Sequence, residues 1–219
     1  MRWRVLQIAD SAFPTGGFAH SSGLEAAVHL GEARTPVRLD SYVGMQLWSV
    51  GTSVLPFVAA AHDRPEEAWS LDALLDQMLN NHVANRASRT QGRAFISTCA
   101  RVYENESIVG LARAARDRSR AAHLAPLFGA SLAALDLSRA ETLALYMFLA
   151  LRGLASAAVR LGVVGPHEAQ RLHARHARTL DAVLAECSAI TPGNAAQAAP
   201  VADILSATHD TLYARLFQS

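Results

Sequence analysis

The sequence contains no lysine, so arginine supplies all 20 of its Lys and Arg side chains. A Walker-type phosphate loop and a Schiff-base mechanism both need a lysine amine, and the composition excludes both. Cysteine is almost as scarce: Cys99 and Cys187 stand outside any metal-ligand or redox spacing. We expect two buried thiols in a reducing compartment. A cytoplasmic location fits such thiols, and we see no secretory signal because residues 1–10 are not followed by a long apolar run.

Net charge and uninterrupted apolar runs are also small. The formal net charge of +1 gives no overall field toward nucleic acid or anionic lipid. Residues 42–61 carry no charge, but Gly44, Gln46 and Pro56 interrupt the run. The second apolar run, residues 143–159, has Arg152 at its centre, where lipid would make a charge costly. Both runs therefore predict buried core helices and no membrane span.

Aromatic residues make up only 6% of the chain and β-branched runs are few, whereas alanine and leucine recur throughout. This mixture predicts an all-α fold. The length of 219 residues favours one domain over residues 1–219, a bundle of about eight to ten helices. Capping and proline signals predict helices over residues of about 22–31, 65–80, 83–103, 106–120, 126–136, 138–162 and 166–187. Two more helices are predicted to begin at residue 36 and after residue 200.

Two of those helix starts carry the capping-box pattern, in which a serine is followed three residues later by glutamate. Ser22 and Glu25 form the first pattern, and Ser138 and Glu141 form the second. A serine and a glutamate at this spacing each satisfy a backbone N–H group at the helix start. We expect both boxes to form.

No catalytic or metal-binding set emerges from the motifs. A zinc-protease signature would need a second histidine where Arg171 follows His167 and Glu168. His173 and His176 share a helix face, but arginines at 171, 175 and 178 surround them, which is more typical of a solvated polar face than of a cation site. We predict no catalytic, metal or cofactor-binding residue.

The two ends of the chain are unusual. Residues 13–20, FPTGGFAH, combine a proline turn, a glycine pair and two apolar rings. The last residues keep Tyr213, Leu216 and Phe217 apolar, although unanchored ends usually lose such side chains. We predict docking segments over about 1–20 and 203–219, with partner-binding residues Phe13, Pro14, Gly16, Gly17, Phe18, His20, Glu25, His209, Asp210, Tyr213, Arg215, Leu216 and Phe217.

Both ends resemble the UreF family of urease accessory proteins, which opens with a stretch like residues 6–25, LQIADSAFPTGGFAHSSGLE. Three further stretches agree in order: SRTQGRAF at 88–95, SAAVRLG at 156–162 followed by Gly165 and Pro166, and YARLFQS at 213–219. The resemblance therefore extends from one end of the chain to the other.

The resemblance implies an all-α homodimer without enzymatic activity. In the family, such a protein joins UreH, called UreD in many species, and the GTPase UreG to deliver nickel to apo-urease. The family's C-terminal segment orders on partner binding and helps to recruit the GTPase, which points to Arg215. Two positions depart from the usual family residues: Phe18 stands where tyrosine is frequent, and Asp210 stands where glutamate is usual.

Two alternatives remain open at this stage. A metal-dependent hydrolase would use His20, His209 and Asp210 and would retain a tightly bound metal. A helical regulator of nucleic acid would use the arginine stripe Arg113, Arg116 and Arg120, although no interleaved aromatic residue is there to stack on bases.

Overall fold

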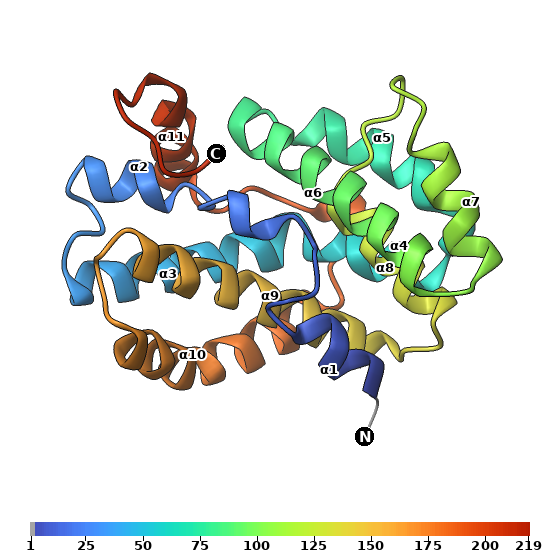
Figure 1. Cartoon of the computed structure of the whole chain (residues 1–219), viewed down its shortest axis with the longest axis horizontal. Helices are drawn as coiled ribbons and strands as arrows, with labels where there is room; N and C mark the ends of the chain where they lie inside the picture. The colour runs from blue at the N-terminus through green and yellow to red at the C-terminus, as the bar shows by residue number, and fades with distance from the viewer. Residues whose placement is uncertain (1–2) are drawn as a thin grey trace.

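Alanine and leucine-rich segments with periodic apolar faces form the helices of this protein, seen in a computed structural model that describes residues 3–219 (Figure 1). Every regular element in this range is helical, which confirms the all-α prediction. The α-helices are α1 (Trp3–Ala9), α2 (Leu24–His29), α3 (Pro36–Ser53), α4 (Leu55–Asp63), α5 (Ala68–Met78), α6 (His82–Val102), α7 (Glu106–Ala114), α8 (Leu124–Ala134), α9 (Arg139–Arg160), α10 (Pro166–Cys187) and α11 (Pro200–Ala207). Only Val54 separates α3 from α4. If these two are counted as one helix, residues 3–219 contain ten α-helices, which is within the predicted range of eight to ten.

Short 3-10 turns join the helices at four places: η1 (Gly17–Ala19), η2 (Pro65–Glu67), η3 (Pro192–Asn194) and η4 (Thr208–Thr211). The first and last of these lie in the two predicted docking segments.

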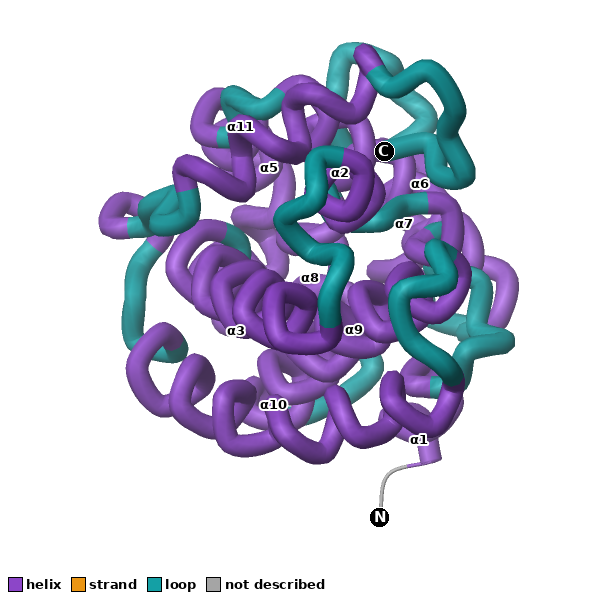
Figure 2. Tube along the Cα trace, turned by 90° about the vertical axis from the view of Figure 1, so that its left-hand side faces the viewer, coloured by secondary structure: helices purple, strands orange, loops and turns teal. Residues whose placement is uncertain are grey.

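The core lies around α8, which is buried on nearly all sides from Ala125 to Leu132. Helix α4 packs closely along α8, and α6 packs against another side of it. Helices α3, α9 and α10 pack against one another in a second group, with α10 beneath α3 and α9 in Figure 2. Helix α4 also contacts α9 and so connects the two groups.

The two long apolar runs are core helices. The segments Pro36–Asp63 and Arg139–Arg160 are long and apolar enough to cross a membrane by length and composition alone. In the bundle, half of the residues in the most apolar window of each segment are buried. Residues 42–61 are divided between α3 and α4, and both helices contribute large side chains such as Leu47 and Phe57 to the core.

One of the two expected capping boxes forms. The Ser138 hydroxyl accepts the N–H of Glu141, whose carboxylate accepts the N–H of Ser138. The prediction at Ser22 is wrong. Helix α2 begins after Gly23, and the backbone there is left-handed, with φ near 54° at Ser22 and 77° at Gly23. The carboxylate of Glu25 is used elsewhere, as described below.

The predicted helix over 106–120 is shorter in the structure and ends at Ala114. The guanidinium of Arg93 on α6 donates to the carbonyl oxygens of Ala115 and Arg120, which lie in the turn that follows α7. These bonds satisfy backbone acceptors that would otherwise need a continued helix or water. Helix α8 begins at Leu124, two residues before the proline that was expected to begin it.

Helices α4 and α8 can pack closely because Gly129 has no side chain. A Cβ atom at Gly129 would overlap the carbonyl oxygen of Val58 in α4, whereas one at Gly153 in α9 would meet no heavy atom within 4 Å. We expect Gly129→Ala to lower the free energy of unfolding by about 1–3 kcal/mol through overpacking. As a matched control, Gly153→Ala should raise it by roughly 0.5–1 kcal/mol through helix propensity. Urea denaturation followed by circular dichroism measures both, and equal effects of the two substitutions would contradict this packing.

Candidate functional site

The two unusual ends of the chain lie side by side. We call residues 10–23 the opening segment and residues 208–219 the tail. The N–H of Gln218 donates to the carbonyl of Ala19 at 2.8 Å, and the N–H of Ser21 donates to the carbonyl of Ser219 at 2.6 Å. In Figure 1 the tail turns back beside α2, so the two ends form one surface. We call this surface the junction.

A buried carboxylate from α2 holds the tail in place. The Glu25 side chain is only 2% exposed, and its Oε1 accepts the N–H of Leu216 at 2.6 Å. Its Oε2 accepts the N–H of Phe217 at 3.2 Å and faces Nε2 of His209 at 2.9 Å. An ionised carboxylate can only accept hydrogen bonds, so we assign the proton to Nε2 of the fully buried His209. One carboxylate thus satisfies three donors of the tail.

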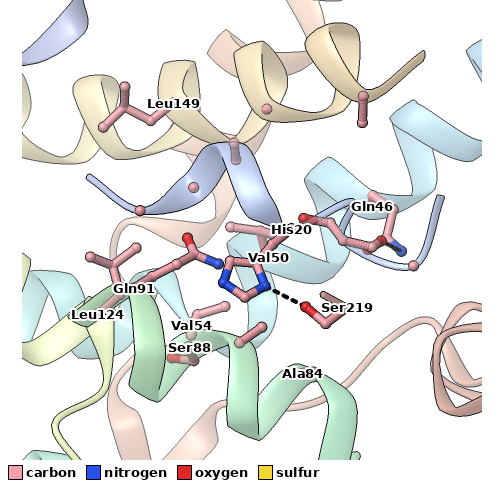
Figure 3. A pocket seen from close by; sticks show the side chains of 18 of the residues that line it. His20, Gln46, Val50, Val54, Ala84, Ser88, Gln91, Leu124, Leu149 and Ser219 are labelled. Atoms are coloured by element: carbon pink, nitrogen blue, oxygen red, sulfur yellow. Dashed lines mark hydrogen bonds between the residues drawn. The ribbon is translucent and has the colours of Figure 1, made fainter. Parts of the chain in front are cut away.

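His20 forms the second link. Its Nδ1 lies 2.5 Å from the hydroxyl oxygen of Ser219, while its Nε2 is buried without a hydrogen-bond partner (Figure 3). Burial is the main cause that lowers the pKa of His20, and the charge of Arg86 lowers it further. The neutral imidazole is therefore the stable form in the folded protein.

Asp210 joins the tail to α6 at the rim of the junction. Its carboxylate accepts two hydrogen bonds from the Arg86 guanidinium, at 2.8 and 3.0 Å. Nε2 of His82 lies 3.2 Å away, and Arg215 also donates to this carboxylate at 3.2 Å. The hydrogen bonds from Arg86 are the main cause that lowers the pKa of Asp210 to about 2. Asp210 is therefore ionised throughout the neutral range.

An arginine from the end of α9 lies between two aromatic rings of the junction. The guanidinium carbon of Arg160 is 3.8 Å from the ring centroid of Phe18 and 4.1 Å from that of Phe217. Arg160 also donates to the carbonyl oxygen of Phe18. These cation–π contacts link the opening segment, the tail and α9, and each contributes on the order of 0.5–1 kcal/mol at a partly exposed site.

Pro14 and the glycine pair Gly16 and Gly17 shape the opening segment. The carbonyl oxygen of Pro14 accepts a hydrogen bond from the hydroxyl of Thr98. The ring of Phe13 stacks on that of Tyr103, with the two ring centroids 6.4 Å apart. Gly16 has φ near 77°, and a Cβ atom there would come within 2.9 Å of the Ala94 side chain. Glycine is therefore required by both the backbone conformation and the close approach to α6.

The predicted partner-binding residues divide into two groups by exposure. The chain itself buries Phe13, His20, Glu25, His209 and Phe217, and partly buries Gly16 and Gly17. Facing outward are Phe18 (72% exposed), Leu216 (53%), the fully exposed Tyr213, and Pro14, Asp210 and Arg215. In this conformation the first group shapes the surface and the second group can reach a partner. That these residues bind a partner stays a prediction.

A cavity of about 380 Å³ lies behind the junction. It is lined by the opening segment and by residues of α3, α6 and α9, and His20 is at its centre in Figure 3, between Gln91 and Ser219. Most of its wall is apolar, with isolated polar groups such as Gln46, Ser88 and Gln91. Among residues 3–219, no group of three or more His, Cys, Asp or Glu side chains could hold a metal ion.

The residues of the hydrolase alternative are each held by other groups, although Nδ1 of His209 lies 3.8 Å from Oδ1 of Asp210. His20 bonds to Ser219, His209 to Glu25, and Asp210 to Arg86 and His82. These contacts build the junction and leave no open metal position between the three side chains.

The second histidine pair is likewise used in packing. His173 lies against the ring of Phe148 at 5.8 Å. His176 is buried beside Thr179 and the carboxylate of Asp40, at 3.2 and 3.4 Å. The two imidazoles therefore serve different contacts.

Sequence reasoning missed four residues of the junction: His82, Arg86, Arg160 and Ser219. For Arg160 and Ser219 a signal existed, because both lie in the stretches 156–162 and 213–219 that carry the family resemblance. His82 and Arg86 gave none, since nothing in the sequence shows that the start of α6 faces the tail.

Comparison with known proteins places these features in a family. A family model described as UreF matches residues 33–177, which lie between the opening segment and the tail. A relative from Arabidopsis thaliana named Urease accessory protein F is 35% identical over all of this chain and 93% of its own length. A relative of the same name from Oryza sativa subsp. indica is 36% identical over 98% of this chain and 84% of its own length. A protein named Urease accessory protein UreF from Arthrobacter sp. (strain FB24) is 31% identical over 97% of this chain and 95% of its own length.

Replacing Glu25 tests the hold on the tail. In Glu25→Gln the amide NH2 group would face either the N–H of Leu216 or the donors of Phe217 and His209, so at least one buried donor would lose its acceptor. We expect a cost of about 1–3 kcal/mol to tail docking. Trypsin can cleave after Arg215 when the tail is undocked, so the cleavage rate follows the undocked population. This rate, measured by mass spectrometry, should rise roughly tenfold for each 1.4 kcal/mol lost from the free energy of tail docking. The exposed carboxylate of Glu32 supplies the control Glu32→Gln; equal cleavage of both variants would disprove the role of Glu25.

The lowered pKa of His20 predicts a pH dependence. Below the ordinary pKa of about 6.5, unfolded His20 binds a proton that folded His20 does not, so stability falls as pH decreases. The slope from one such group is at most about 1.4 kcal/mol per pH unit. His20→Gln should flatten the decline in unfolding free energy between about pH 7.5 and 5.5, whereas the exposed-site control His29→Gln should not. Parallel curves for all three proteins would refute this assignment.

Proposed function

This chain belongs to the UreF family of urease accessory proteins, and on that premise we propose that it is a non-catalytic, chaperone-like adaptor in urease maturation. In this proposal the chain joins UreH, or UreD, and together with it recruits the GTPase UreG so that nickel reaches apo-urease. Nickel is the cargo of the complex. The junction is the surface that contacts the recruited proteins.

The observation that carries this proposal is the outward face of the junction. Phe18, Tyr213, Arg215 and Leu216 are exposed there on backbone that Glu25 and His20 hold in place. Aromatic and arginine side chains supply most of the binding energy in many protein interfaces. Because the tail is already ordered, it loses less conformational entropy when a partner binds.

The arrangement favours positioning over chemistry. The junction's carboxylates are occupied by donors of the same chain: Glu25 by the tail and Asp210 by Arg86 and Arg215. No nucleophile with an adjacent general base belongs to the exposed group. We infer that the chain contributes binding energy, while the nucleotide-driven change that moves nickel occurs in the GTPase.

We also propose a homodimer in the cytoplasm. Apolar side chains outside the junction remain exposed on α1, α3 and α11, including Trp3 (75%), Val37 and Ile204. A symmetric pairing of two copies would cover part of this surface. The two cysteines are buried, and burial raises the pKa of the Cys99 thiol to about 12, as suits an unreactive reduced thiol.

The proposal predicts a specific loss in Arg215→Ala. Capture of the purified GTPase by the complex with UreH should fall at least tenfold, because a central arginine in an interface contributes on the order of 2 kcal/mol. The dimer mass from light scattering and the melting temperature should stay unchanged, since the exposed Arg215–Asp210 pair adds little stability. Arg171→Ala on α10, which also removes an exposed ion-paired arginine, serves as the control. Undiminished GTPase capture by Arg215→Ala would remove this residue from the interface.

A further inference from the structure

A second surface, remote from the junction in sequence, is strongly basic. A groove of about 510 Å³ runs between α6 and α7, which are joined by a short turn at the right of Figure 1. Five arginines line it, and no carboxylate belongs to its wall. We call this the arginine groove; its lining residues are Arg93, Ile96, Ser97, Ala100, Arg101, Val109, Ala112, Arg113, Ala115, Arg116 and Arg118.

Four of these arginines have no acidic partner among the residues that the structure describes. Arg101, Arg113, Arg116 and Arg118 are exposed, and no carboxylate of residues 3–219 lies within 4.0 Å of their nitrogens. Elsewhere among residues 3–219, eight arginines do pair with carboxylates at that distance: Arg38, Arg64, Arg86, Arg89, Arg139, Arg171, Arg175 and Arg215. These four positive charges therefore form no ion pair among residues 3–219, although the whole chain is nearly neutral.

The fifth arginine, Arg93, fixes the shape of the groove. Its guanidinium donates to the carbonyls of Ala115 and Arg120 and so holds the turn after α7 against α6. Burial and the neighbouring charges of Arg118 and Arg89 lower the pKa of Arg93. Burial is the main cause of this shift, and the charges of Asp72 and Asp117 act against those of the two arginines. Asp117 lies nearby, but its carboxylate accepts the N–H of Ser119 in its own turn.

The lining between the arginines is apolar. Ile96 and Ala100 from α6 and Val109 and Ala112 from α7 line the groove, and Val109 remains 39% exposed. Such a groove offers a hydrophobic strip flanked by guanidinium groups. A helix or extended peptide with acidic residues beside apolar ones would satisfy both features at once.

We propose that the arginine groove binds an acidic, amphipathic segment of a partner protein. Arginine pairs with carboxylates in a bidentate geometry, and the apolar strip would bury the leucine or valine side chains of such a segment. Nucleic acid fits less well, because none of the lining residues is an aromatic on which bases would stack, and the apolar strip would stay uncovered. This inference does not depend on the proposed function, since it concerns the C-terminal half of α6, whereas His82 and Arg86 of the junction lie near its start, and a different class of contact.

The test uses the full chain and a fluorescein-labelled synthetic peptide made of Glu, Asp, Leu and Ala in a helical amphipathic order. Binding is followed by fluorescence anisotropy at about 0.1 M salt, where charges interact over roughly 10 Å. Comparison probes are an all-glutamate peptide and a single-stranded oligonucleotide, both of equal charge. The groove variant is Arg101→Gln with Arg113→Gln and Arg116→Gln. The matched control, Arg64→Gln with Arg171→Gln and Arg178→Gln, loses the same charge on other surfaces, and circular dichroism confirms that both fold.

We expect the amphipathic peptide to bind more tightly than either comparison probe. The groove variant should weaken this binding about tenfold or more, and Val109→Asp should also weaken it, whereas the control variant should bind like the unmodified chain. Absence of saturable binding, or equal weakening by both triple variants, would overturn the proposal. Tighter binding of the oligonucleotide with the same dependence on the groove arginines would assign the groove to nucleic acid instead.

Discussion

The junction depends on a charged group in a place where charge is costly. Glu25 is a carboxylate with 2% of its side chain exposed, and it remains tolerable there because three donors of the tail surround it. A buried carboxylate without such partners would lose several kcal/mol of solvation. The dependence is mutual, since the N–H groups of Leu216 and Phe217 have no helix or sheet to satisfy them. The tail therefore has one favourable position, and the position of Phe18 and Tyr213 relative to each other follows from it.

The same arrangement explains why the junction can be rigid and still display apolar residues. Phe217 turns inward against Arg160, while Leu216 and Tyr213 on the same tail face solvent. The inward residues supply the contacts that hold the tail, and the outward ones contribute almost nothing to the stability of the isolated chain. Exposed leucine and tyrosine on an ordered segment are unfavourable in water unless a partner covers them. The stability of the tail and the energy available for binding thus come from different side chains of one segment.

The sequence predicted the fold better than it predicted the site, for physical reasons. Helix class and most boundaries follow from local rules, and α10 runs over Pro166–Cys187 as expected. The failure at Ser22 arose because a tertiary demand replaced a local one: Glu25 satisfies the tail, so it is not available to cap its own helix. Likewise, α7 stops early because Arg93, from another helix, satisfies the backbone of the turn. The proximity of the two ends could be expected from the sequence. The contacts that His82, Arg86 and Arg160 make with these ends could not, because they depend on how distant helices pack.

The junction and the arginine groove differ in how far their interactions reach. At the junction, Arg86 and Arg215 share the carboxylate of Asp210, so attraction there acts mainly through contact and apolar burial. In the groove, four arginines without carboxylate partners produce a field that extends over about a Debye length, roughly 8 Å at physiological ionic strength. A field of this kind raises association rates and weakens with salt, whereas burial of Leu216 or Tyr213 slows dissociation and is nearly independent of salt. A partner that used both surfaces would be attracted first by the groove and held by the junction. The two contributions are separable, because added salt reduces the first and leaves the second.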